Sequence, residues 1–198
     1  VVEDNIRFYS SFLPAIYAEL FQHTHRLLSE GHNLSQKMLR MRARPKVLLC
    51  ASFEEAWDYF ERYEEQILGV VSDIEFPMGG EVHKQAGLEL ARRVLRARSD
   101  VRIVLQSSVA GNRVLAEELG ASFLLKGSPL LLQELRKVML QDFAFGDFIF
   151  KDAKGKELTW ASDLRGLEEK LATVPPESII RHSGRNHFSR WLKARTEF

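Results

Sequence analysis

The sequence predicts a doubly wound α/β fold, in which helices cover both faces of a parallel sheet. Short apolar runs alternate with stretches of helical periodicity along residues 1–141. The apolar runs lack the polar alternation of half-exposed strands, so we expect strands that are buried on both faces. Five successive strand–helix units favour parallel strands joined by helical connections. Residues 142–198 follow a different pattern and predict a small α+β extension.

The composition is that of a soluble globular protein. A chain of 198 residues can bury one core and still carry an extension. The formal net charge of +1 provides no global field that would attract nucleic acid or an acidic membrane. No apolar run approaches the length of a membrane span, and the single Cys50 suits a reducing compartment. We therefore expect a cytoplasmic protein without a membrane partner. Both chain ends look cut, so we expect a piece of a larger protein.

The first elements are a strand, a long helix and a basic stretch. Val1-Val2 would end the first strand, and apolar spacing predicts a helix over residues 6–28 that Pro14 kinks or restarts. Gly31 and Asn33 mark the expected helix end. Residues 34–46 are basic and contain no acid, which favours a solvated loop or helix extension. The alternative is a docking surface for an acidic partner or nucleic acid.

The next two strands surround a well-capped helix. Val47–Cys50 is the second predicted strand, and Ser52 opens a capping box before a helix that carries Phe60 on its apolar face. Residues 67–71 form the third strand, which runs into Asp73, and Pro77 is expected to stop regular structure. A loop with two glycines should follow.

The remaining units of the sheet follow in order. We expect a helix over residues 86–98, a strand over 101–105 that leads to Ser107, a helix near 112–119, and a strand over 122–125 that ends at Lys126. Ser128 and Pro129 predict the start of the next helix, with serine as N-cap and proline in the first position.

Polar side chains follow four of these strands, where each strand ends. They are Glu3, Asp4, Asp73, Ser107 and Lys126. The carboxyl ends of parallel strands meet at one edge of a sheet, so we expect these side chains to converge. Three neighbouring carboxylates repel one another unless a cation lies among them, and oxygen ligands suit Mg²⁺. An aspartate can accept a phosphoryl group, while a metal ion and a lysine stabilise its charge. The sequence therefore predicts a phosphoryl-transfer site.

These residues resemble the receiver domains of two-component response regulators. The likeness covers residues 1–141 and includes Gly87-Leu88-Glu89-Leu90 at the start of a helix. It implies a flavodoxin-like (βα)5 fold with strand order 2-1-3-4-5. It also implies that Asp73 is the phosphoacceptor, that Glu3, Asp4, Asp73 and the backbone carbonyl of Glu75 hold Mg²⁺, that Lys126 pairs with the phosphate, and that Ser107 and Phe123 are switch residues. The implied partner is a sensor histidine kinase, and the face of residues 110–141 would support a homodimer.

Three features depart from the pattern of that family. Gly127 replaces the usual proline after the lysine, the first helix and its loop are longer, and segment 78–86 is enlarged. A pseudo-receiver that binds partners without phosphoryl transfer is therefore the alternative.

Residues 142–198 predict a β-hairpin and two helices. Residues 147–150 and 156–160 flank a turn-like cluster, Ser162 or Asp163 caps a helix, and a last helix covers residues 184–198. His182 and His187 are five residues apart without further ligands, which argues against a metal site. Output to DNA through the basic tail ranks last, because no helix-turn-helix is evident.

The tail has a second, more particular resemblance. The sequences Phe145–Phe148, Arg185–Trp191 and Ala194–Phe198 are similar to the amino-terminal region of bacterial phosphoenolpyruvate synthase and pyruvate phosphate dikinase-like proteins. This likeness implies a downstream catalytic domain in the same chain, controlled by the receiver. Whether the chain belongs to an enzyme stays open at this point, because residues 1–198 contain no glycine-rich phosphate loop.

Overall fold

The computed structural model describes residues 1–30 and 33–196, which form two compact units. The first unit comprises residues 1–18 and 46–138, and the second comprises residues 19–45 and 139–198. Residues 19–45 thus associate with the C-terminal part of the chain. The predicted domain boundary between residues 141 and 142 stays a prediction.

A three-stranded parallel sheet lies at the centre of the first unit. Its strands are β1 (Gly69–Asp73), β4 (Arg102–Ser107) and β5 (Ser122–Leu125), in the order β1-β4-β5. Val2 adds single parallel bridges to Cys50 and to Ser72, with hydrogen bonds from Val2 N to Val71 O and from Asp73 N to Val2 O. The predicted α/β class with a parallel sheet is confirmed.

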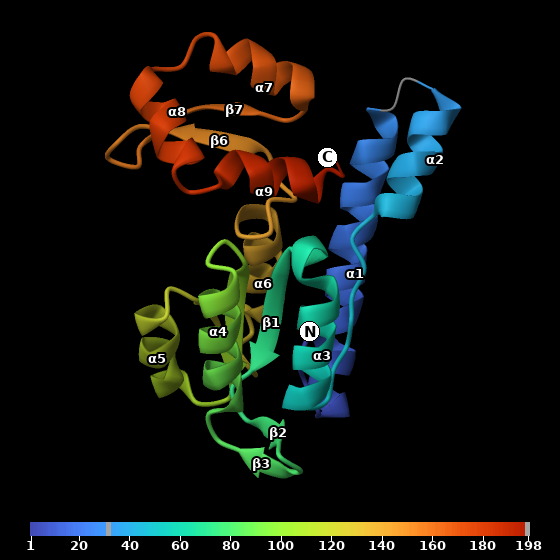
Figure 1. The fold of residues 1–198 in the computed structure, drawn as a ribbon, viewed down its shortest axis with the longest axis vertical. Helices are drawn as coiled ribbons and strands as arrows, with labels where there is room; N and C mark the ends of the chain where they lie inside the picture. The colour runs from blue at the N-terminus through green and yellow to red at the C-terminus, as the bar shows by residue number, and fades with distance from the viewer. Residues whose placement is uncertain (31–32, 197–198) are drawn as a thin grey trace. The chain divides into compact units, whose positions relative to one another are not determined.

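Helices pack against this sheet and bury an apolar core. The helices that contribute buried side chains to this core are α3 (Phe53–Tyr63), α4 (Ala86–Ala97) and α5 (Arg113–Glu118). The unit also contains η1 (Glu64–Gln66), η2 (Ala110–Asn112) and the start of α6 (Leu131–Gln141). Figure 1 shows α3 and α4 as neighbours beside β1. Ser52 caps α3 as predicted, because its Oγ accepts a hydrogen bond from Glu55 N at 3.2 Å. Phe60, Leu88, Leu105 and Phe123 belong to one core cluster.

A short β-hairpin stands where the sequence predicted an irregular loop. Strands β2 (Phe76–Met78) and β3 (Glu81–His83) pair antiparallel and form a small hairpin next to the sheet (Figure 1). The expectation that Pro77 ends regular structure is wrong. Proline is tolerated in an edge strand, and Pro77 lies opposite Val82. Gly79 and Gly80 both have positive φ, which the tight two-residue turn requires.

Other differences concern element boundaries. Only Cys50 of the predicted second strand is bridged, and residues 45–49 have no regular structure. Helix α6 begins at Leu131, since Ser128 Oγ accepts from Leu130 N within a preceding turn. Helix α1 (Ile6–Ser29) continues through Pro14 without a restart. Its predicted end marker, Gly31, lies outside the described residues.

The second unit is built around a hairpin and three short helices. Strands β6 (Phe148–Lys151) and β7 (Glu157–Ala161) pair antiparallel, which confirms the predicted hairpin. Helix α7 (Leu164–Leu171) is capped by Asp163, whose side chain accepts from Gly166 N at 2.7 Å. Helices α8 (Pro176–Ser183) and α9 (His187–Ala194) follow. The sequence predicted only one helix here, over residues 184–198. Residues 197–198 of that predicted helix lie outside the described part. Proline at the first helical position is the missed signal for α8.

Buried polar contacts tie residues 19–45 to this unit. The His23 ring stacks on Phe145 at 4.4 Å, and its Nε2 lies 2.7 Å from Ala194 O. Helix α2 (Leu34–Ala43) is held to α1 by Arg40, which donates to Leu27 O at 2.6 Å. The predicted helix extension in the basic stretch is therefore present as a separate helix. In the described ranges, every helix is too short or too polar to traverse a lipid bilayer.

Candidate functional site

The parallel register brings four sequence-predicted residues to one edge of the sheet. Asp73 ends β1 and lies opposite Gln106 of β4, so that Ser107 follows one position later. Lys126 comes directly after β5, and its N–H donates to Ser107 O at 2.9 Å. The bridges of Val2 place Glu3 beside the end of β1. The sheet itself therefore assembles the predicted site.

Lys126 joins the two buried carboxylates of this site. Its Nζ lies 2.5 Å from Oδ2 of Asp73 and 2.6 Å from Oε2 of Glu3. The side chains are almost fully enclosed, with exposed fractions of 4% for Lys126, 0% for Glu3 and 12% for Asp73. An ammonium group between two carboxylates in a low-dielectric site offsets much of their mutual repulsion.

Further donors fix the orientation of both carboxylates. Ile74 N donates to Oδ1 of Asp73 at 2.7 Å, and the backbone N–H of Glu75 also bonds to this side chain. Glu3 accepts from Gln106 Nε2 at 3.0 Å and from Asn5 N at 3.2 Å. Charge-assisted hydrogen bonds of this kind restrict the rotamers of both acids.

Burial dominates the electrostatics of the two acids. It raises the pKa of Asp73 and the pKa of Glu3, and the contacts with Lys126 oppose this effect in both cases. The negative charge of Asp73 raises the pKa of Glu3 further. The raised pKa values mean that burial disfavours the charged form of both acids, a cost that a bound cation would offset. Perturbed carboxyl pKa values of this kind are typical of functional sites.

The oxygen atoms at this edge fit a divalent cation. Glu3, Asp4 and Asp73 each offer one carboxylate oxygen, and these oxygens lie within 4.8 Å of one another. Asp4 is exposed, whereas the other two acids are buried. With Lys126 present, three carboxylates leave a net charge of about −2, which a hard divalent cation matches. The donor set therefore suits Mg²⁺. Glu75, whose backbone carbonyl is the fourth predicted ligand, lies exposed in the turn after Asp73.

Ser107 is held by the loop that follows its strand. Its Oγ accepts from Val109 N at 3.1 Å and from Asn112 Nδ2 at 2.9 Å. A hydroxyl has two acceptor positions and one proton, so these bonds leave the proton available for donation. A role of Ser107 as a switch residue stays a prediction.

Phe123 is a core residue of β5 with one polar contact. It belongs to the apolar core cluster, and the guanidinium of Arg113 lies 5.0 Å from its ring centroid. A switch role for Phe123 stays a prediction.

Three residues of the site were not predicted for their roles. Gln106 ties β4 to Glu3, and the Phe8 ring lies 4.2 Å from Nζ of Lys126. A Cβ on Gly87 would come within 2.0 Å of Asp73 O, so only glycine lets α4 approach the aspartate backbone. A polar residue directly after the apolar run of β4 gives a weak signal for Gln106, whereas Phe8 follows the first strand by several residues and gives none.

The loop after β5 departs from the expected receiver pattern in the structure as in the sequence. The Lys126–Gly127 peptide is trans, and Gly127 has a φ of 79°. Lys126 nevertheless reaches both acids. Comparisons with protein-family models, with curated proteins and with solved structures find no match for this chain.

Proposed function

We propose that residues 1–141 form a receiver domain that accepts a phosphoryl group on Asp73 with Mg²⁺. The observation that carries the proposal is the contact of Lys126 with both Asp73 and Glu3, at strand ends where Asp4 adds a third carboxylate. This is the arrangement expected for a phosphoacceptor, a charge-balancing lysine and a metal site.

The bridges of Val2 also support the finer fold proposal. Val2 pairs in parallel with Cys50 on one side and with Ser72 of β1 on the other. If residues 47–50 and 1–2 count as strands, the order becomes 2-1-3-4-5, with β1, β4 and β5 as the third to fifth strands. This is the order of a flavodoxin-like (βα)5 domain.

In the proposed reaction, a carboxylate oxygen of Asp73 attacks phosphorus of a phosphohistidine on a sensor kinase. The new O–P bond forms as the N–P bond breaks, and the imidazole nitrogen takes up a proton. Ile74 N–H orients the carboxylate, and Lys126 balances charge on the transferred group. A Mg²⁺ ion held by Glu3, Asp4, Asp73 and the Glu75 carbonyl would neutralise phosphoryl oxygens.

The signal would leave the site through the two predicted switch residues. Ser107 would turn its proton towards the phosphoryl group, and Phe123 would change its rotamer, so that the face of residues 110–141 shifts between two states. Val114, Leu130 and Leu132 on this face are exposed apolar side chains. They suit contact with a second copy or with a downstream domain, for which a phosphoenolpyruvate synthase-like enzyme is the candidate.

Phosphorylation by acetyl phosphate with Mg²⁺ tests the proposal. Intact-protein mass should rise by one phosphoryl group, and fluorine NMR should detect bound beryllofluoride. Asp73→Asn should abolish both signals. Asp58→Asn is the matched control, because Asp58 is an exposed acid that pairs with Arg62. Unmodified wild-type protein together with no beryllofluoride signal would refute phosphoryl acceptance.

A pseudo-receiver is the second candidate, and two observations favour it. The ammonium of Lys126 already contacts both buried acids, and trans Gly127 departs from the family pattern. A site of this kind can serve as a structural ion-pair network that holds the strand ends together and transfers no phosphoryl group. In that case Mg²⁺ would leave the melting temperature unchanged. If the site does bind Mg²⁺, an ion concentration of about 100 times the Kd would raise the free energy of unfolding by about 2.7 kcal/mol.

A further inference from the structure

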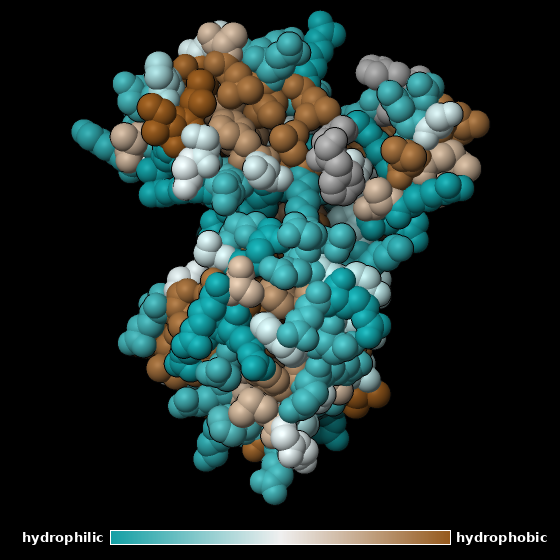
Figure 2. Space-filling view, in the orientation of Figure 1, coloured by the Kyte–Doolittle hydropathy of each residue, from teal (hydrophilic) through white to brown (hydrophobic). Residues whose placement is uncertain are grey.

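Helix α2 carries an apolar stripe that the second unit does not cover. Leu34, Met38 and Met41 share one face by their i, i+4 and i+7 spacing, and their exposed fractions are 76%, 49% and 45%. No residue of α2 is buried. Figure 2 shows hydrophobic side chains in brown on the surface of α2. Three long apolar side chains in a row are the usual anchors of a helix that binds in a groove.

Basic side chains flank this stripe. Lys37 and Arg42 are exposed on its two sides, and the sequence has no acid between residues 31 and 53. Arg40 is turned towards α1, where it contacts Leu27 O and Glu30. The side of α2 that faces outward is therefore apolar along its centre and positive at its edges.

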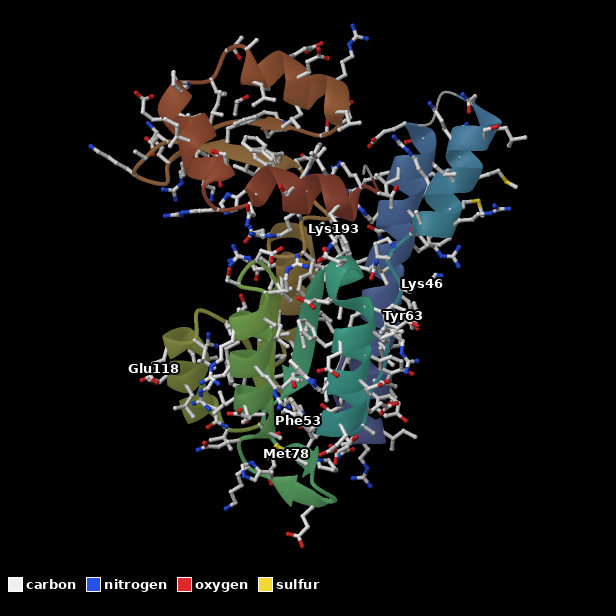
Figure 3. All side chains as sticks on the ribbon, in the orientation of Figure 1. Lys46, Phe53, Tyr63, Met78, Glu118 and Lys193 are labelled. Carbon is white, nitrogen blue, oxygen red and sulfur yellow. The ribbon has the colours of Figure 1, made fainter. Side chains whose placement is uncertain are left out.

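The first unit contains a groove that is also apolar at its centre but is lined by acidic side chains. It has a volume of about 440 Å³ and is lined by apolar side chains of Phe53, Trp57 and Met78. Figure 3 labels Phe53 and Met78, which lie close together where α3 meets the β2–β3 hairpin. A volume of this size accommodates several apolar side-chain groups.

Acids of α3 form the rim of this groove. Glu54, Asp58 and Glu61 line it, together with Gly79 and Arg93. The Arg93 guanidinium lies over the Trp57 ring at 4.5 Å, and Gly79 N donates to Oε1 of Glu54 at 2.8 Å. Arg62 pairs with Asp58 at 2.9 Å, but the three acids outnumber Arg62 and Arg93, so the rim keeps a net negative charge around an apolar floor.

We propose that α2 of one copy of this chain binds the α3 groove of a second copy. The apolar stripe of α2 would fill the apolar floor, and Lys37 and Arg42 would face Asp58 and Glu61. Contact between two α2 helices is disfavoured, because it would bring their basic flanks together. Each chain carries one of each surface, so the contact closes a ring or extends to further copies. This surface differs from the face of residues 110–141, and the proposal does not depend on phosphorylation.

Sedimentation velocity over about 1 µM to 1 mM tests the proposal, because this concentration range detects a Kd as weak as about 1 mM. Wild-type protein should self-associate, with a population that rises with concentration. The pair Lys37→Glu and Arg42→Glu should weaken association at least tenfold, and so should Asp58→Lys with Glu61→Lys. An equimolar mixture of the two double variants should recover it, because each reversed surface then meets its complement. Lys154→Glu with Lys156→Glu is the control, since both lysines are exposed outside these surfaces.

Three outcomes would overturn the inference. Wild-type protein that stays monomeric throughout refutes a second copy as the occupant, and recovery that fails in the mixture refutes the pairing of α2 with the groove. Pelleting of monomeric protein with phosphatidylserine vesicles, lost on reversal of Lys37 and Arg42, would assign α2 to a lipid surface instead. Circular dichroism of each variant verifies its folding, which is expected because α2 buries no residue and because Asp58 and Glu61 of α3 are exposed.

Discussion

Replacing Lys126 by methionine keeps an unbranched apolar stem and removes the ammonium group from between Glu3 and Asp73. The lysine lies 2.5 and 2.6 Å from the two carboxylates, and all three side chains are largely excluded from solvent. Removing one partner of a buried ion pair costs about 3–5 kcal/mol, since the remaining charge keeps its desolvation penalty. We expect about 3 kcal/mol here, because Asp73 retains 12% exposure and Gln106 still donates to Glu3.

The pH dependence of this variant has a defined sign. Burial already raises the pKa of Glu3 and of Asp73, and loss of the lysine raises both further. The folded state then binds more protons than the unfolded state above the ordinary carboxyl pKa of about 4. The deficit of the variant should therefore be largest near neutral pH and should shrink as the pH falls towards about 4.

Urea denaturation at neutral and acidic pH measures this effect, with Arg62→Met as the matched control. Arg62 pairs with Asp58 on the exposed surface of the same unit, so its loss should cost less than about 1 kcal/mol. Added Mg²⁺ should restore part of the stability of Lys126→Met if the three acids bind a cation. A deficit below about 1 kcal/mol at neutral pH, equal to that of the control, would refute the argument that Lys126 offsets buried charge.

Two further predictions concern a buried histidine and a buried glycine. Burial lowers the pKa of His23 to about 4, below its ordinary value near 6.5. The contribution of neutral His23 to the free energy of unfolding is therefore fully present above pH 6.5, and about 3 kcal/mol of it is lost as the pH drops to about 4. Thermal melts should show this loss. His23→Gln should reduce the loss, whereas His25→Gln, at an exposed position, should not. In Gly87→Ala, the new Cβ would meet Asp73 O at 2.0 Å, so α4 must shift. We expect a loss of about 1–3 kcal/mol and weaker beryllofluoride binding, whereas Gly111→Ala, with open space around its Cβ, should change neither; unchanged stability in Gly87→Ala would contradict the packing argument.

Much of the site could be predicted from where the strands end. Parallel pairing forces the carboxyl ends of strands to one edge, so Asp73, Ser107 and Lys126 converge as soon as β1, β4 and β5 are recognised. The same logic finds Glu3, although Val2 contributes only single bridges. These predictions depend on local patterns, namely apolar runs and the polar residues that follow them.

Other features depend on contacts between residues far apart in the chain. The stacking of His23 on Phe145 and the association of residues 19–45 with residues 139–198 have no local signal. The β2–β3 hairpin also escaped prediction, because a proline in a short run usually argues against a strand. Its pairing requires only that Pro77 occupy a position where no N–H is needed.

The sequence by itself determined the α/β class, the edge at which polar side chains gather, and the cap at Ser52. It left Ser162 and Asp163 as alternative caps, of which the structure shows Asp163. These properties follow from periodicity and from hydrogen bonds between near neighbours in the chain. Tertiary structure alone decided that Lys126 contacts both Glu3 and Asp73, and that Gly87 must lack a side chain. Such details depend on how closely strands and helices approach one another, which is fixed by the packing of the whole core.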